Sequence, residues 1–235
     1  MFWKKKNPES GSLEKAAAHQ LYEYLCETIM RDGRIRAEDL ITAASSIVGE
    51  LCIGATGDFD PRKHQFVPGS RVFSEKVNEL FSGNVQDLQQ IPSSTIVGTL
   101  RDSLLAAGYD VADFPSMKHV FEHYAAKIGN KADWGKVPLS ISSDNQPFVV
   151  PLQVTYETRP VVDRIFQTLN TPQQRLRASV MALAEALIAV REAIDKRIVL
   201  TLALEVINGM AKTAPMTAEA MATAIKKQSE GPLNQ

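Results

Sequence analysis

Apolar residues recur in steps of four and three along residues 172–208, where no interior proline or glycine interrupts the chain. This spacing is typical of a helix whose apolar seam packs against other helices. Thr171 and Gln174 have the spacing of a capping box, and Gly209 marks the far end. We therefore expect one long helix here. Its seam consists of Leu176, Val180, Leu183, Leu187, Val190 and Ile194.

The seam shifts by four residues after Ile194 and resumes through Ile198, Leu202 and Val206. Most positions between these are also apolar, and a helix that is apolar on nearly every side must be surrounded by other elements. Burying all of it within one chain of this size is demanding. We therefore expect a homodimer with an interface at or near residues 198–207. The proposed interface residues are Ile198, Leu200, Leu204 and Ile207.

Shorter stripes of the same period predict further helices over residues 12–32 and 36–54, joined by a tight Asp32-Gly33 turn. Others are expected to begin at Ser70, at Ser93 or Ser94, and at Ser116, and a last one at Thr217. The resulting division is a disordered tail (1–11), an N-terminal helical region (12–130), a connector (131–157) and a C-terminal helical region (158–228). The last region is expected to pack on the first, and the two could form a single domain.

The pattern changes to alternation in the connector. Leu139 and Ile141 alternate with polar residues, and the residues from Phe148 to Tyr156 alternate again after a turn-like stretch. This period predicts a two-stranded β-hairpin with Pro151 forcing its second strand to an edge or a bulge. A short helix is expected to follow over residues 160–169. The predicted fold class is therefore mainly α, a multi-helix bundle with one small β-hairpin near the middle of the chain.

The charge and the cysteine content limit the classes of function that this chain can have. The formal net charge is -1, so no global basic field favours nucleic-acid binding. Cys26 and Cys52 occupy apolar positions of predicted helices, as reduced core cysteines do, which is consistent with a cytoplasmic protein. No window is long and uncharged enough to predict a transmembrane segment.

One catalytic pattern is present. His119, Glu122 and His123 fit H-x-x-E-H, and this five-residue stretch resembles the zinc-binding motif of inverzincin peptidases. The resemblance implies that the two histidines hold zinc while Glu122 acts as general base. A third ligand would be needed, and Glu192 or Glu205 could supply it. The other interpretation is an ordinary solvated helix face without any cofactor.

The segment of residues 54–70 is rich in glycine, proline and aspartate, which predicts a long loop. Phe59, Phe66 and Val67 place apolar groups among its polar ones, as in loops that contact a partner. Together these features predict a non-enzymatic helical protein that acts through protein–protein contacts and self-associates. The alternative is a metal-dependent hydrolase centred on His119, Glu122 and His123.

Overall fold

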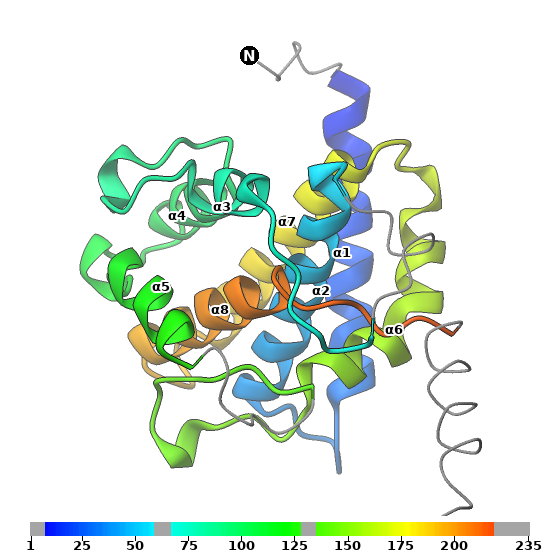
Figure 1. The fold of residues 1–235 in the computed structure, drawn as a ribbon. Coiled ribbons are helices and arrows are strands. Elements are labelled where there is room, and N and C mark those ends of the chain that lie inside the picture. Colours follow the sequence, from blue (N-terminus) through cyan, green and yellow to red (C-terminus); the bar gives the residue numbers. More distant parts are fainter. Residues whose placement is uncertain (1–7, 59–66, 128–134, 219–235) are drawn as a thin grey trace, which may run out of the picture.

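The computed structural model describes residues 8–58, 67–127 and 135–218. Within these ranges the chain forms a bundle of α-helices with no β-strand, joined by loops and single 3-10 turns (Figure 1). The predicted mainly helical fold is confirmed. The helices are α1 (Pro8–Ile29), α2 (Ala37–Thr56), α3 (Glu75–Ser82), α4 (Ile96–Ala106), α5 (Met117–Ala126), α6 (Pro151–Ile165), α7 (Pro172–Val190) and α8 (Lys196–Met210).

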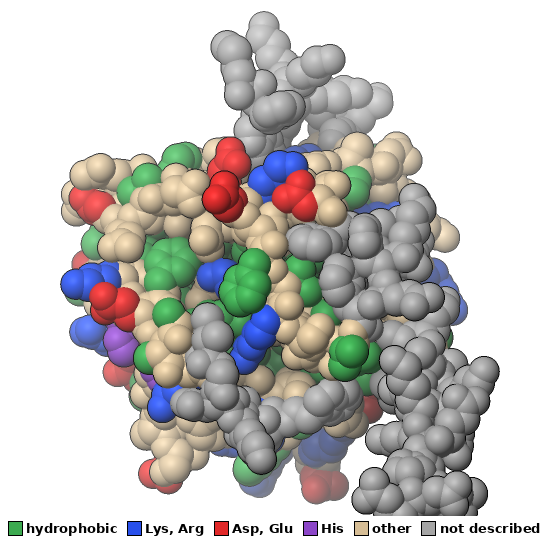
Figure 2. Space-filling model, viewed as in Figure 1, with side chains coloured by type: hydrophobic (Ala, Val, Ile, Leu, Met, Phe, Trp, Pro, Cys, Tyr) green, Lys and Arg blue, Asp and Glu red, His purple; other side chains and the backbone are tan. Residues whose placement is uncertain are grey.

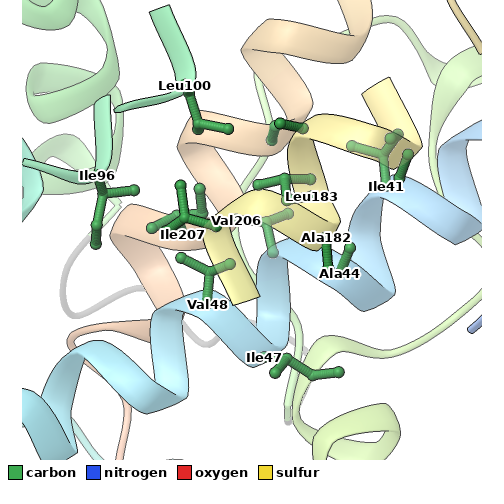
Figure 3. Close-up of a cluster of buried hydrophobic side chains, with 14 of the residues drawn as sticks. Ile41, Ala44, Ile47, Val48, Ile96, Leu100, Ala182, Leu183, Val206 and Ile207 are labelled. Atoms are coloured by element: carbon green, nitrogen blue, oxygen red, sulfur yellow. The ribbon is translucent and has the colours of Figure 1, made fainter. Parts of the chain in front are cut away.

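Helix α2 lies at the centre of the bundle, where it contacts α1, α3, α6, α7 and α8. One cluster of buried apolar side chains includes residues of all eight helices, so both predicted helical regions share a core. Figure 3 shows part of this cluster, in which α2 meets side chains of α4, α7 and α8. The labelled members are Ile41, Ala44, Ile47, Val48, Ile96, Leu100, Ala182, Leu183, Val206 and Ile207.

Helix α2 is also long and apolar enough to cross a bilayer by length and composition alone. However, 83% of the apolar window is buried inside the bundle. Central helices of water-soluble bundles share this composition. The feature is therefore explained by the position of α2 in the core and does not identify a membrane span.

The start of α7 follows its sequence signal. The Thr171 hydroxyl accepts a hydrogen bond from the Gln174 backbone N–H at 3.2 Å, and the Gln174 side-chain oxygen accepts one from the Thr171 backbone N–H at 3.1 Å. This confirms the predicted capping box. The predicted turn between α1 and α2 is also confirmed, since Arg31 and Arg34 exchange two backbone hydrogen bonds of 2.9 Å around it.

The single long helix predicted over residues 172–208 is wrong. The chain leaves the helical path at residues 191–195 and starts α8 afresh. The Asp195 carboxylate caps the new helix by accepting hydrogen bonds from the Arg197 and Ile198 N–H groups, at 2.8 and 3.3 Å. The four-residue shift of the apolar seam in the sequence therefore marks the position where one helix ends and the next begins.

The predicted β-hairpin is also wrong. Residues 137–150 form an irregular loop with one 3-10 turn, and the expected second strand is the start of α6. Pro151 occupies the first turn of that helix, where its missing N–H costs nothing. The buried face uses Thr155 and Thr158, whose hydroxyls bond to backbone carbonyls one turn earlier. Thr155 hid the helical period, because it counted as a polar position of the strand predicted from Phe148 to Tyr156.

Two smaller boundaries differ from the prediction. Helix α3 begins at Glu75 rather than at Ser70, because residues 69–72 pair with residues 212–214 through backbone hydrogen bonds. Helix α6 contains Pro160 in its interior, where a new helix was expected to start. The helix predicted at Thr217 lies mostly outside the described residues.

A close approach of two backbones fixes the packing of α2 on α8. A Cβ atom added to Gly49 would lie 2.6 Å from the Met210 Cβ and 2.9 Å from the Ile207 carbonyl oxygen. Gly54, five residues further along α2, has open space at the same position. The two glycines therefore offer a matched pair of substitutions.

We expect Gly49→Ala to destabilise the protein by about 1–3 kcal/mol, because the new methyl group forces α2 and α8 apart. Gly54→Ala should be neutral or stabilise by up to about 1 kcal/mol, since alanine is the better helix former. Urea unfolding of both variants measures this difference. Equal stabilities would show that the α2–α8 contact tolerates a side chain.

Candidate functional site

Three polar residues interrupt the apolar surface of α8 and its end. Glu205, Asn208 and Lys212 are spaced by three and four positions, so they share one side of the helix. That side meets α5, since the Asn208 amide lies 3.5 Å from the Val120 carbonyl oxygen. Glu205 and Asn208 are almost completely buried, at 2% and 1% exposed. Buried polar groups at such a contact are candidates for function.

The Glu205 carboxylate forms the acidic end of this strip. It accepts hydrogen bonds from the Ser140 backbone N–H at 2.8 Å and from the Ser140 hydroxyl at 2.6 Å. His119 Nε2 lies 3.0 Å from the Ser140 Oγ and 3.7 Å from Glu205 Oε1. The serine thus lies between the imidazole and the carboxylate. In a nucleophilic triad the histidine takes that middle place, so this arrangement does not activate Ser140 in that way.

The H-x-x-E-H residues are only partly brought together. The rings of His119 and His123 stack with their centroids 5.9 Å apart. Glu122 is exposed and lies 3.7 Å from Lys118. Of the two proposed third ligands, Glu205 is near His119, whereas Glu192 is exposed and pairs with Arg191.

In the parts of the chain that the structure describes, no three histidine, cysteine or acidic side chains are grouped to hold a metal ion. His123 Nε2 is nevertheless buried and has no hydrogen-bond partner there. For the hydrolase alternative, the described residues therefore supply one histidine–carboxylate pair, His119 and Glu205, and not a set of three zinc ligands.

The basic end of the strip lies around the Tyr124 ring of α5. Lys212 Nζ donates to the Asn208 amide oxygen at 2.6 Å and lies 5.3 Å from the Tyr124 ring centroid. The Arg71 guanidinium lies 4.9 Å from the same centroid, and its Nη1 donates to the Tyr124 hydroxyl at 2.6 Å. Phe121 adds a second ring, 5.2 Å from Lys212 Nζ. Two cations thus approach one aromatic side chain, whose ring face attracts positive charge.

Burial governs the ionisation of this cluster. It lowers the pKa of Lys212 from 10.5 to about 8, because desolvation penalises the ammonium form. It raises the pKa of the neighbouring Cys52 thiol to about 12, so this cysteine is an inert core residue rather than a nucleophile. It also raises the pKa of Tyr124. At neutral pH Lys212 is therefore mainly charged, while Tyr124 and Cys52 are neutral.

Exposed apolar side chains border this basic cluster. The backbones of residues 69–72 and 212–214 are paired by hydrogen bonds of 2.7–3.0 Å. Val67 and Phe73 lie just outside the pairing and are 69% and 64% exposed. Hydrophobic and basic side chains gather on the face over α3, α5 and α8 (Figure 2). We call Arg71, Phe73, Phe121, Tyr124 and Lys212 the aromatic–basic face.

The structure describes one of the three predicted contact residues of the loop. Val67 is exposed beside the aromatic–basic face, whereas Phe59 and Phe66 lie outside the described residues. Sequence reasoning missed Phe73, because the helix expected to begin at Ser70 would have included it. The available signal was the alternation in residues 71–73, where half-buried Arg71 and exposed Phe73 flank buried Val72.

The predicted dimer interface is located in the core. Leu200, Leu204 and Ile207 are 0% exposed, and only Ile198 is half-buried. The helices that cover this segment, α2, α5 and α6, belong to the same chain. Leu200, Leu204 and Ile207 therefore have no exposed surface with which to contact a second copy, whereas Ile198 keeps part of its surface.

A separate open hollow of about 520 Å³ lies between α1, the start of α2 and the end of α7. Its polar groups already have partners within the chain. Glu38 pairs with Arg36 at 3.3 Å, and Asn145 bonds to Ser142 at 2.8 Å. The aromatic–basic face differs in this respect, because neither of its two cations has a carboxylate partner among the described residues.

Comparison of the chain with protein-family models, with curated proteins and with solved structures found no match.

The lowered pKa of Lys212 predicts how the stability of the protein depends on pH. Between about pH 8 and pH 10.5 the unfolded chain binds more protons at this residue than the folded protein does, so its contribution to stability rises with pH. Wild-type protein should gain stability relative to Lys212→Met across this interval. Urea unfolding at several pH values measures the gain. Lys118→Met, at an exposed lysine, is the control and should show no such trend. Parallel stability curves for wild type and Lys212→Met would contradict the assignment.

The histidines make a second prediction. We expect His119→Ala combined with His123→Ala to lower stability by less than about 1 kcal/mol, because His119 is half-exposed and its one hydrogen bond is to a serine. Thermal unfolding checks this. Elemental analysis of zinc-loaded, dialysed protein should show no stoichiometric metal. Stoichiometric zinc that disappears in the double variant would instead favour the hydrolase alternative.

Proposed function

We propose that this protein is a non-enzymatic helical binding module that acts through protein–protein contacts at the aromatic–basic face. The observation that carries the proposal is the exposed Phe73 side chain two residues after Arg71, whose guanidinium binds the Tyr124 hydroxyl, in a segment held by backbone pairing. Aromatic residues and arginine dominate the binding energy of protein interfaces. A large apolar side chain left in water next to such residues is typical of an interaction site.

The way in which this face is attached to the helix bundle supports the same function. Val72 is buried and its N–H donates to the Lys212 carbonyl oxygen, so the segment that presents Phe73 is fixed to the end of α8. A preformed surface loses little conformational entropy when a partner binds. The two cysteines are free, and this supports a cytoplasmic location. Self-association stays a prediction, and it would have to use a surface other than residues 198–207.

A photo-crosslinking phenylalanine analogue tests the proposal at position 73, with position 148 as the matched control. Phe148 is also an exposed aromatic residue, at 81%, but it lies against Arg36 in another part of the molecule. In cells that express the protein, we expect a discrete cross-linked adduct from position 73 and none of the same mass from position 148.

The captured protein is then purified and its binding measured directly. Phe73→Ala should weaken binding at least about tenfold, as expected for an interface hot spot, and Phe148→Ala should not. Absence of an adduct at position 73, or binding that is insensitive to Phe73→Ala, would remove the support for this face. Light scattering over a wide concentration range decides separately whether the partner is a second copy of the chain.

A further inference from the structure

The pairing of arginines sets the aromatic–basic face apart from the rest of the described chain. Every other half-buried arginine there has a carboxylate within 4 Å. The pairs are Arg36–Glu38, Arg101–Asp102, Arg159–Glu50, Arg175–Asp163, Arg177–Glu14 and Arg191–Glu192. Arg71 is the exception, since its described partners are the neutral oxygens of Tyr124 and Thr213.

Lys212 shares this property. Its ammonium group bonds to the Asn208 amide oxygen and faces the rings of Phe121 and Tyr124. Burying a cation without a counter-charge costs free energy, and an incoming anion recovers part of that cost. Within the described part of the chain, two such cations beside one ring form a site of positive charge that no carboxylate compensates, in a protein whose net charge is -1.

The free donors indicate where an anion would bind. Both hydrogen bonds of Arg71 to described residues use Nη1, which leaves Nε and Nη2 for a ligand. These two donors form the fork that matches the two oxygens of a carboxylate. Lys212 Nζ lies 5.3 Å from the centroid of the Tyr124 ring, which the Arg71 guanidinium also approaches, so both cations border one aromatic side chain.

We infer that the partner bound at the aromatic–basic face contributes an acidic segment, and that one of its carboxylates lies between Arg71 and Lys212. An apolar side chain next to that carboxylate packs on Phe73. This inference rests on the proposed function and adds the chemistry of the partner. Charge complementarity carries it, because the two cations of the face have no carboxylate partners among the residues that the structure describes, and apolar surface is adjacent to them.

Selection of random twelve-residue peptides displayed on phage tests the inference with the full-length protein as bait. We expect the enriched peptides to combine aspartate or glutamate with a neighbouring aromatic or aliphatic residue. Synthetic versions should bind the wild-type protein in a salt-dependent way. Replacing their acidic residues by asparagine and glutamine should weaken binding at least about tenfold.

Variants of the protein locate the contact. Arg71→Gln combined with Lys212→Gln should weaken binding at least about tenfold, whereas Arg197→Gln, at an exposed arginine of α8, should leave it unchanged. Arg71→Lys keeps the charge but loses the two-donor fork, so it should bind more weakly than the wild type and more tightly than Arg71→Gln. This order also guards against a general folding defect. Circular dichroism and thermal unfolding of each variant check that the bundle is intact.

The outcomes separate the two proposals. Enriched peptides without an acidic excess that are lost in Phe73→Ala would overturn the acidic partner but leave the binding face. Peptides that depend on neither Phe73 nor the two cations, or no enriched peptide at all, would count against both. Competition by inorganic phosphate at lower concentration than by the acidic peptides would overturn the inference and assign the cations to a small anion.

Discussion

The contact between α2 and α8 is the constraint on which the rest of the structure depends. Gly49 lets the two backbones come close, and α8 then occupies a position enclosed by α2, α5 and α6. Because α8 is fixed in this way, its single polar side faces α5 and its end carries Lys212 to the surface. The core and the aromatic–basic face are therefore two results of one packing arrangement.

The sequence predicted the helices well where local chemistry and apolar period agree. The capping box at Thr171 and the turn at Asp32-Gly33 are local signals that tertiary packing does not change. The break before Asp195 and the start of α6 were missed for opposite reasons. Asp195 acts as a cap only because the chain turns before it, while Thr155 is a buried polar residue at a position that fits strand alternation.

The candidate site could be predicted only in part, because its residues come from separate parts of the chain. The histidine motif and the exposed Val67 were visible as local patterns. The link of Ser140 to Glu205 and the meeting of Arg71 with Lys212 depend on how helices pack, and no spacing encodes them. A cation without a carboxylate partner is likewise not recognisable from a sequence in which the numbers of acidic and basic residues are nearly equal. Whether a carboxylate lies near a given cation depends on the folded structure.

The pairing of residues 69–72 with residues 212–214 also has a consequence for the order of events during synthesis. The Arg71 guanidinium and the Thr213 hydroxyl are 142 positions apart in the chain. Contacts of such high sequence separation form late, because a long loop must close first. A ribosome-bound chain displays Phe73 well before Lys212 emerges, so it lacks one of the two cations. Recognition through both cations would thus be restricted to fully synthesised, folded molecules.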